Sequence, residues 1–331
     1  MRRTAVYLNC APGQCGVYEY GRRCGLALAR GGVRYAWQYI STDDPSLAAA
    51  ALKSLGAVAC VVANWHPVTL PWYDESWMAR LAREQHARVG QTVRFLAVHH
   101  DDHPCPHPTV SAQIHPDPTR PESPGTFNCV RLVSPLADPG PPPQCLTVGT
   151  MGLAFGGKRF DWVVEEILRC WAPGEARVRM HIPAARHGDQ DLAKGYAAVR
   201  GAEEVAGPGG TRIEHSWEWL DEESLLRWLA GNSINVFCYE ELRARSAGSV
   251  LDYALGAGRP VAVTNSWMFR HVRDAYPGMV LGPTRTLRDV LEAGTAPLEP
   301  FIRSWTAQAL VRDTERACAA VEDVPPCLIE W

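Results

Sequence analysis

Short runs of apolar and β-branched residues alternate with longer helical stretches along the first half of the chain. The expected strands are Ala5–Leu8, Tyr35–Ile40, Ala57–Ala63 and Val93–His99, and the expected helices are Val17–Ala29, Ser46–Leu55 and Glu75–Val89. Strands that alternate with helices at this spacing form βαβ units, in which the strands are parallel. The pattern therefore predicts an α/β domain whose ligands bind at the carboxyl ends of the strands.

A proline-rich segment interrupts this alternation near the middle of the chain. Residues Ser134–Cys145 read SPLADPGPPPQC, a composition unsuited to a helix or a central strand. Such a composition is typical of a semi-rigid linker. We therefore predict that a first, Rossmann-like domain covers residues 1–140.

The alternation resumes after this segment. The expected strands are Leu146–Val148, Val178–Ile182, Arg212–His215, Ile234–Cys238, Pro260–Thr264 and Met279–Leu281. The expected helices are Phe160–Trp171, Gln190–Val205, Glu222–Ala230, Ser249–Gly256, Leu287–Ala293 and a final Pro300–Val321. We predict a second Rossmann-like domain over 141–300, and a C-terminal helix within 301–331 that packs back toward the first domain. The predicted architecture is two doubly wound domains facing a central cleft.

Length and charge agree with this division. A chain of 331 residues suits two domains of about 150 residues each. The net charge of -3 gives no signal for nucleic acid or for a membrane surface.

The cysteines and the N-terminus bear on the compartment. The count of 11 cysteines is odd, and Cys10, Cys60 and Cys238 lie in or beside apolar runs, where a free cysteine packs as a small hydrophobe. The N-terminus lacks an apolar signal segment, and no run reaches the roughly 18 apolar residues of a membrane span. These features predict reduced thiols and a cytoplasmic protein.

The segment 239–271 carries the strongest binding signal. After the strand ending at Cys238, a polar loop with Arg243 and Arg245 leads to the small residues of 246–249 and a short helix. A helix N-terminus offers free N–H groups to a phosphate, and arginines add charge-assisted hydrogen bonds. Asp252, in the first turn, is placed to bind a ribose hydroxyl. The alternative interpretation is an ordinary capped helix with surface arginines.

This segment resembles the donor-binding segment of GT-B glycosyltransferases. The resemblance lies in the helix start followed by DYALGAGRPVAVT. It implies that Asp252 replaces the ribose-binding glutamate, and that Ser246, Gly248 and Ser249 face the diphosphate or the sugar. The sequence departs from many retaining members at Ala244, where they carry a second glutamate.

A second segment supports the same resemblance. The segment 147–152 reads TVGTMG, a strand running into a glycine-containing loop, and Lys158 precedes the next expected helix. In GT-B enzymes a basic residue of this loop neutralises the donor diphosphate, which makes Lys158 the candidate; a solvated lysine at a helix start is the alternative. In the first domain the loop around Gly16 resembles sequences that touch donor phosphate, although a tight βα turn needing glycine explains it equally well. The spacing of a dinucleotide fingerprint is absent, which counts against NAD.

Histidines gather where the strand Val93–His99 ends. The segment 99–107 reads HHDDHPCPH, and this density of imidazole and carboxylate suits zinc or manganese. Its prolines and lack of a regular helical face argue against a preformed metal site. The resemblance instead implies that His99 faces the reacting sugar, as a base if the transfer inverts configuration; a histidine that merely ends the strand is the alternative.

Aromatic residues follow another strand of the first half. Trp65, His66 and Trp72 are candidates for the acceptor side, because aromatic rings stack on sugar faces, although such rings also anchor loops.

The resemblance implies a hexosyltransferase-like glycosyltransferase. It would move a sugar from a nucleoside-diphosphate sugar to an acceptor hydroxyl, with no bound metal or other cofactor. Two alternatives remain open. One is a metal-dependent hydrolase that uses the cluster His99–His107, and the other is a non-catalytic protein that binds nucleotide-sugars.

Overall fold

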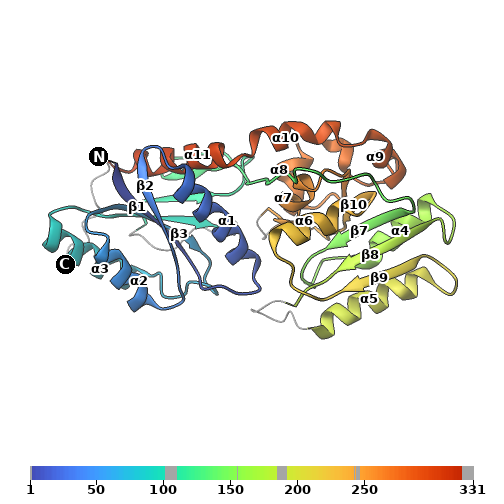
Figure 1. The fold of residues 1–331 in the computed structure, drawn as a ribbon, viewed down its shortest axis with the longest axis horizontal. Coiled ribbons are helices and arrows are strands. Elements are labelled where there is room, and N and C mark those ends of the chain that lie inside the picture. Colours follow the sequence, from blue (N-terminus) through green and yellow to red (C-terminus); the bar gives the residue numbers. More distant parts are fainter. Residues whose placement is uncertain are drawn as a thin grey trace. The chain divides into compact units, whose positions relative to one another are not determined.

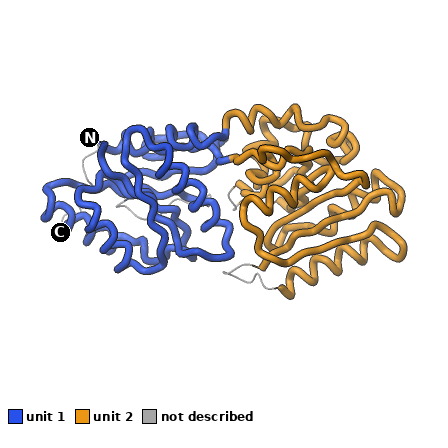
Figure 2. The backbone as a smooth tube through the Cα atoms, viewed as in Figure 1, with its two compact units in different colours: residues 1–132, 305–331 blue, residues 133–304 orange. Residues whose placement is uncertain are grey.

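The computed structural model describes residues 2–100, 110–154, 156–184, 192–241, 243 and 247–322. These residues form two compact units, 1–132 with 305–331 and 133–304 (Figure 2). Each unit contains one parallel sheet with helices packed against it (Figure 1). The predicted α/β class, with two Rossmann-like units, is therefore confirmed. No described helix is long and apolar enough to cross a membrane.

The sheet of unit 1 has the strand order β2-β1-β3-β4-β5-β6. The strands are β1 (Arg3–Asn9), β2 (Tyr35–Ser41), β3 (Val58–Trp65), β4 (Arg94–His99), β5 (Ala112–His115) and β6 (Thr126–Asn128). Strands β5 and β6 were not predicted from the sequence. They extend the parallel sheet beyond β4, with Leu96 paired to Ala112 and Gln113 paired to Thr126.

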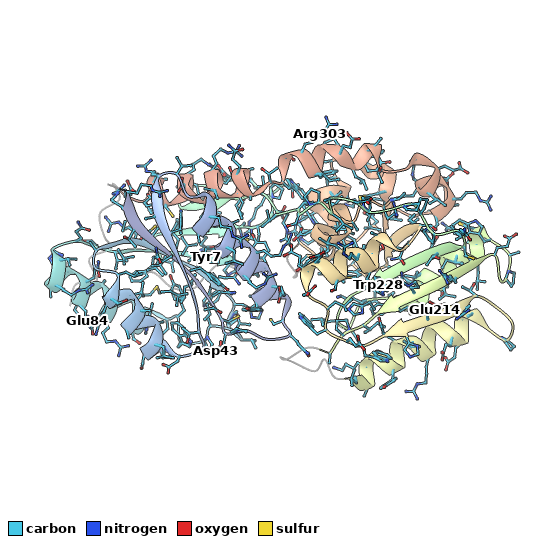
Figure 3. All side chains as sticks on the ribbon, viewed as in Figure 1. Tyr7, Asp43, Glu84, Glu214, Trp228 and Arg303 are labelled. Carbon is cyan, nitrogen blue, oxygen red and sulfur yellow. The ribbon has the colours of Figure 1, made fainter. Side chains whose placement is uncertain are left out.

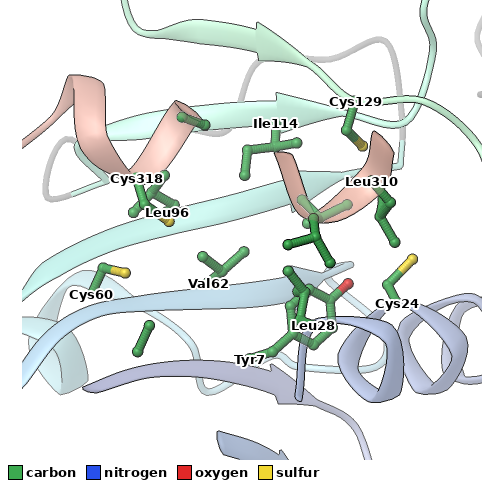
Figure 4. Close-up of a cluster of buried hydrophobic side chains, with 14 of the residues drawn as sticks. Tyr7, Cys24, Leu28, Cys60, Val62, Leu96, Ile114, Cys129, Leu310 and Cys318 are labelled. Atoms are coloured by element: carbon green, nitrogen blue, oxygen red, sulfur yellow. The ribbon is translucent and has the colours of Figure 1, made fainter. Parts of the chain in front are cut away.

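Helices cover both faces of this sheet. They are α1 (Gly16–Gly31), α2 (Pro45–Ser54), α3 (Glu75–Val89) and α11 (Ala307–Ala320). Successive strand side chains point to opposite faces. Ala5 and Tyr7 accordingly belong to the core that includes residues of α1 and α11 (Figure 4), whereas Val6 and Leu8 belong to the core on α2 and α3. Asp44 and Asp74 cap α2 and α3 by accepting hydrogen bonds from their first-turn N–H groups.

The C-terminal helix is held to unit 1 by a buried carboxylate. Glu315 of α11 accepts hydrogen bonds from the backbone N–H groups of 33–35 and, at 3.1 Å, from the indole of Trp37. The expected helix Pro300–Val321 is in fact two helices, because Thr306 caps a new start after α10 (Glu299–Ser304).

The sheet of unit 2 has the order β11-β10-β7-β8-β9. Its strands are β7 (Leu146–Met151), β8 (Ala176–His181), β9 (Arg212–Ser216), β10 (Ile234–Phe237) and β11 (Val261–Val263). The main helices are α4 (Phe160–Cys170), α5 (Leu192–Ala206), α6 (Glu222–Ala230), α7 (Val250–Gly256) and α9 (Leu287–Ala293). The short elements are α8 (Arg270–Arg273) and the 3-10 turns η1 (Trp267–Phe269), η2 (Pro277–Met279) and η3 (Ala296–Leu298). The strand predicted at Met279–Leu281 was wrong, since η2 ends there and only Val280 pairs, with Val263.

The proline-rich segment is fixed to unit 2. The guanidinium of Arg259 donates to the carbonyls of Pro139, Gly140 and Pro141 at 2.9–3.0 Å. The segment also runs close to α7, where a Cβ on Gly256 would lie 2.4 Å from the Ser134 carbonyl oxygen. Unit 2 accordingly begins at Val133, before most of the prolines.

Candidate functional site

The strand order of unit 2 reverses between β7 and β10. From β7 the chain proceeds to β8 and β9 on one side, and then to β10 and β11 on the other. In open α/β sheets, ligands bind outside the carboxyl ends of the strands at this switch point. The loops that follow β7 and β10 therefore form the candidate site of unit 2.

Backbone hydrogen bonds join these two loops. Lys158 and Tyr239 form an antiparallel bridge, flanked by Arg159 N–H to the Cys238 carbonyl and Glu240 N–H to the Gly157 carbonyl, both 2.8 Å. A third strand end joins them, because the hydroxyl of Thr264, just after β11, donates to the Tyr239 carbonyl at 2.7 Å. The main chain at Lys158 is thus fixed from both sides of the switch point.

The Lys158 ammonium lies beside the Tyr239 ring and Gly152. Its Nζ is 5.2 Å from the centre of the Tyr239 ring, and a Cβ on Gly152 would come within 2.4 Å of it. Gly152 has φ 137°, a conformation that L side chains rarely adopt. Burial lowers the pKa of Lys158 to about 7, because the charged form loses its hydration. The lysine can therefore gain a full charge when an anion approaches.

The charge of the neighbouring Arg159 is balanced by two carboxylates. Arg159 forms an ion pair with Asp161 and another with Glu240 at 3.1 Å, and its guanidinium lies over the Trp162 ring at 4.2 Å. Hydrogen bonding to Asp161 raises the pKa of Arg159. Arg159 thus links the first turn of α4, through Asp161, to the loop after β10, through Glu240.

The predicted phosphate cradle at α7 is described in part. Arg245 and Ser246 lie outside the described residues, and Arg243 is exposed and pairs with Glu241 at 3.1 Å. Gly248 donates its N–H to the Met268 carbonyl at 2.8 Å, and Ser249 precedes α7 without a side-chain capping hydrogen bond. The structure thus brings the α7 start beside the segment that follows β11.

Asp252 lies in the first turn of α7 and is fully buried, with 0% of the residue exposed. A ribose hydroxyl reaches this carboxylate only after a local rearrangement. Its role in ribose binding stays a prediction.

Sequence reasoning did not identify His181 as a site residue, although it ends β8 at the same edge of the sheet. Its carbonyl accepts from Gly152 N–H at 2.9 Å. Its Nδ1 lies 2.9 Å from Ser216 Oγ, and its ring lies 5.4 Å from that of Trp228. Trp228 is labelled in Figure 3. Burial, and secondarily Arg179, lower the pKa of His181 to about 4, so this side chain is neutral at physiological pH.

In unit 1 the strand order reverses between β1 and β3. Asn9 and Asn64 lie at the carboxyl ends of these strands, and both are buried. Their amides donate to the carbonyls of Tyr18 and Val17. The predicted phosphate loop at Gly16 is therefore the first turn of α1, and these amides hold it to the sheet.

The predicted acceptor-side residues occupy different environments. His99 is only 2% exposed, with its ring stacked on Trp65 at 5.2 Å and edge-on to His115 at 5.7 Å. His66 accepts the N–H of Val68 at its Nδ1, 3.2 Å away. Trp72 packs against the Trp77 ring at 5.1 Å, beside the core. His99 and Trp65 therefore lie together at the sheet edge, whereas Trp72 packs with α3. Sequence reasoning missed His115, which ends the unpredicted strand β5.

The described residues contain no group of three or more His, Cys, Asp or Glu side chains placed to hold a metal ion. Most of the cluster His99–His107, namely residues 101–107, lies outside the described part of the chain.

Comparisons with known proteins place this geometry in a structural class. No protein-family model matches the chain, and no curated protein does. A glycosyltransferase from Rickettsia africae ESF-5 has a similar structure, with a TM-score of 0.67 and 11% identity, covering 98% of this chain and 100% of that one. Anabaena HepE, solved with UDP and glucose, has a TM-score of 0.63 and 8% sequence identity, covering 96% of this chain and 100% of that one. The E. coli trehalose-6-phosphate protein bound with UDP-2-fluoro glucose has a TM-score of 0.60 and 11% sequence identity, covering 98% of this chain and 100% of that one.

These similarities extend over both units. The chain therefore has the GT-B fold of these glycosyltransferases, which confirms at the level of fold the resemblance found in its sequence.

Proposed function

We propose that this protein is a glycosyltransferase that takes its sugar from a nucleoside-diphosphate donor. The observation that carries the proposal is the contact of Lys158 with Tyr239 and Gly152 at the switch point of unit 2. Its support from related folds is that two similar structures hold UDP with glucose or a UDP-glucose analogue.

Lys158 would bind the diphosphate and stabilise it as a leaving group. A cation held in a desolvated site interacts with developing negative charge more strongly than it would in water. Arg159 and Glu240 would fix the two loops, and neutral His181 would support the turn at Gly152 without adding charge. The N-terminal end of α7, with Gly248 and Ser249, would line the same site.

Unit 1 would then bind the acceptor, with His99 and Trp65 at the edge of its sheet. His66 and Trp72 remain candidates on the same side. Catalysis would come mainly from positioning and from electrostatic stabilisation of the leaving group. The proposal requires no NAD-like cofactor.

A thermal-shift screen tests the donor class. UDP, GDP, ADP and dTDP, each with and without an attached glucose, would be added to the purified protein. A ligand at about one hundred times its dissociation constant stabilises the folded state by about 2.7 kcal/mol. Two results together support a transferase: stabilisation by one nucleoside diphosphate, and slow hydrolysis of the corresponding nucleotide-sugar to that nucleoside diphosphate. Stabilisation without turnover over a broad acceptor panel supports a binding protein instead, and no stabilisation contradicts both.

A further inference from the structure

Tyr239, which follows β10 in unit 2, has a buried hydroxyl group without a hydrogen-bond partner. The residue is only 4% exposed, and within the described residues its hydroxyl oxygen is shielded from solvent and makes no hydrogen bond. Buried polar groups in native proteins nearly always have a partner, and one without a partner destabilises the folded state. The packing of the ring alone therefore does not explain a tyrosine at this position, where phenylalanine would pack as well.

The main chain of Tyr239 is paired on both sides. Its N–H donates to Thr264 Oγ1 at 2.8 Å, and the Thr264 hydroxyl donates to its carbonyl at 2.7 Å. Lys158 forms the antiparallel bridge with it. The backbone position of Tyr239 is thus fixed by the segments that follow β7, β10 and β11.

The ring of Tyr239 lies between residues of two other segments of unit 2. The Phe269 ring lies 4.7 Å away between centroids, at an angle of 43°, and Phe269 is itself fully buried. Lys158 Nζ is 5.2 Å from the centre of the Tyr239 ring. Because buried side chains are closely packed, these neighbours hold the ring, and with it the hydroxyl, in one orientation beside the lysine.

The Tyr239 hydroxyl is a hydrogen-bond donor at physiological pH. Burial raises the pKa of Tyr239, because the phenolate form would lose its hydration, so the oxygen keeps its proton. A donor is satisfied by an oxygen that carries no hydrogen. The neighbouring Lys158 ammonium favours an oxygen with negative charge, and a phosphoryl oxygen meets both requirements.

We propose that the Tyr239 hydroxyl donates a hydrogen bond to a phosphoryl oxygen of the diphosphate that Lys158 binds. The inference rests on the proposed function and adds a neutral, directional donor to the cation of that site. The anion reaches the hydroxyl when the Lys158 side chain turns from the ring toward it, a movement that the flexible stem of lysine allows. The hydroxyl thus destabilises the ligand-free protein and stabilises the complex.

Tyr239→Phe tests this contact, because it removes the oxygen and keeps the ring that lies against Lys158 and Phe269. Titration calorimetry would use the nucleoside diphosphate that stabilises the protein most in the thermal-shift screen. Loss of a hydrogen bond to a charged group predicts binding about 10 to 150 times weaker than in the wild type. The loss should be the same with and without an attached glucose, because the contact is to phosphate. A loss confined to the nucleotide that carries glucose would assign the hydroxyl to the sugar and overturn the proposal.

Urea unfolding without ligand provides an independent readout. Tyr239→Phe should unfold at the same or a higher urea concentration than the wild type, because a buried hydroxyl without a partner is removed. Tyr73→Phe is the matched control, since Tyr73 is fully buried in unit 1 and its hydroxyl donates to the Leu96 carbonyl at 3.1 Å. The control should unfold at a lower urea concentration and bind the nucleotide as the wild type does. If Tyr239→Phe were destabilised as much as the control, its hydroxyl would have a partner within the protein, and the proposal would be overturned.

Proton uptake on binding separates the role of Tyr239 from that of Lys158. Calorimetry in two buffers of different ionisation enthalpy should give the same uptake for Tyr239→Phe as for the wild type, because the lysine keeps its surroundings. A changed uptake would show that the substitution acts through Lys158, which contradicts a direct contact.

The affinities also distinguish failure of this inference from failure of the proposed function. Equal affinity of the wild type and Tyr239→Phe for a nucleotide that both bind would contradict the inference and leave the proposed function standing. If the wild type bound none of UDP, GDP, ADP and dTDP, both would be contradicted.

Discussion

The ammonium nitrogen of Lys158 lies 5.2 Å from the centre of the Tyr239 ring, across the switch point of the second sheet. The two residues come from loops that follow β7 and β10, about eighty positions apart in the chain. Their backbone bridge fixes the lysine where a phosphate is expected to bind.

Donor binding should depend on pH through Lys158. Its pKa of about 7 in the ligand-free protein means that it is partly neutral at physiological pH. A bound diphosphate favours the charged form and raises the pKa, so binding takes up a proton. Affinity should therefore be highest below pH 7 and should fall as pH rises above 7. Calorimetry in two buffers of different ionisation enthalpy measures this proton uptake.

Lys158→Arg is the control for that dependence. Arginine stays charged over the whole range, so its binding should take up no proton near neutral pH. Proton uptake equal to that of the wild type would assign the effect to another group.

Gly152→Ala should weaken donor binding and destabilise unit 2. The new Cβ would meet Lys158 Nζ at 2.4 Å, and the backbone φ of 137° suits glycine. A strained backbone of this kind costs about 1–3 kcal/mol. Gly156→Ala is the matched control in the same loop, since its Cβ would meet nothing within 4 Å. Urea unfolding and donor titration of both variants check the prediction, and equal effects would contradict it.

Glu315→Ala should loosen the C-terminal helix from unit 1. Its carboxylate accepts from three backbone N–H groups and from the Trp37 indole. Their loss leaves buried donors without a partner, at a cost of about 3 kcal/mol. Glu84→Ala, which removes an exposed partner of Lys53, should change stability by less than about 1 kcal/mol. Chemical denaturation of both variants measures the difference, and similar losses would show that Glu315 has no special role.

The alternation of apolar runs and helical stretches predicted the parallel strands of the second sheet and the first four strands of the first sheet, because these strands are mostly apolar. The strands β5 (AQIH) and β6 (TFN) were missed because their short sequences are mostly polar, unlike those of the equally short β10 (INVF) and β11 (VAV). The final helix was predicted as continuous because Thr306 was not recognised as a cap. The run Met279–Leu281 is apolar because Met279 and Leu281 are buried, not because it forms a strand.

The candidate site was only partly accessible to sequence reasoning. Lys158 was proposed because its strand and glycine loop resemble those of GT-B donor domains, but its contact with Tyr239 depends on strand order, which a single sequence does not contain. The contact between His100 and Asn64 was equally hidden, since the two residues lie far apart in the sequence and the fold brings them together. Local patterns predict elements, whereas the chemistry of a buried group depends on its neighbours in space.

The central claim is that Lys158 binds the diphosphate of a nucleotide-sugar, and titration calorimetry with UDP at pH 6.5 tests it most directly. The wild type, Lys158→Ala and the exposed-lysine control Lys53→Ala would be compared. A charge-assisted hydrogen bond of about 1.5–3 kcal/mol predicts that Lys158→Ala binds UDP about 10 to 150 times more weakly, while Lys53→Ala binds as the wild type does. Equal affinity in all three proteins, or no binding of UDP or any other nucleoside diphosphate to the wild type, would contradict the account.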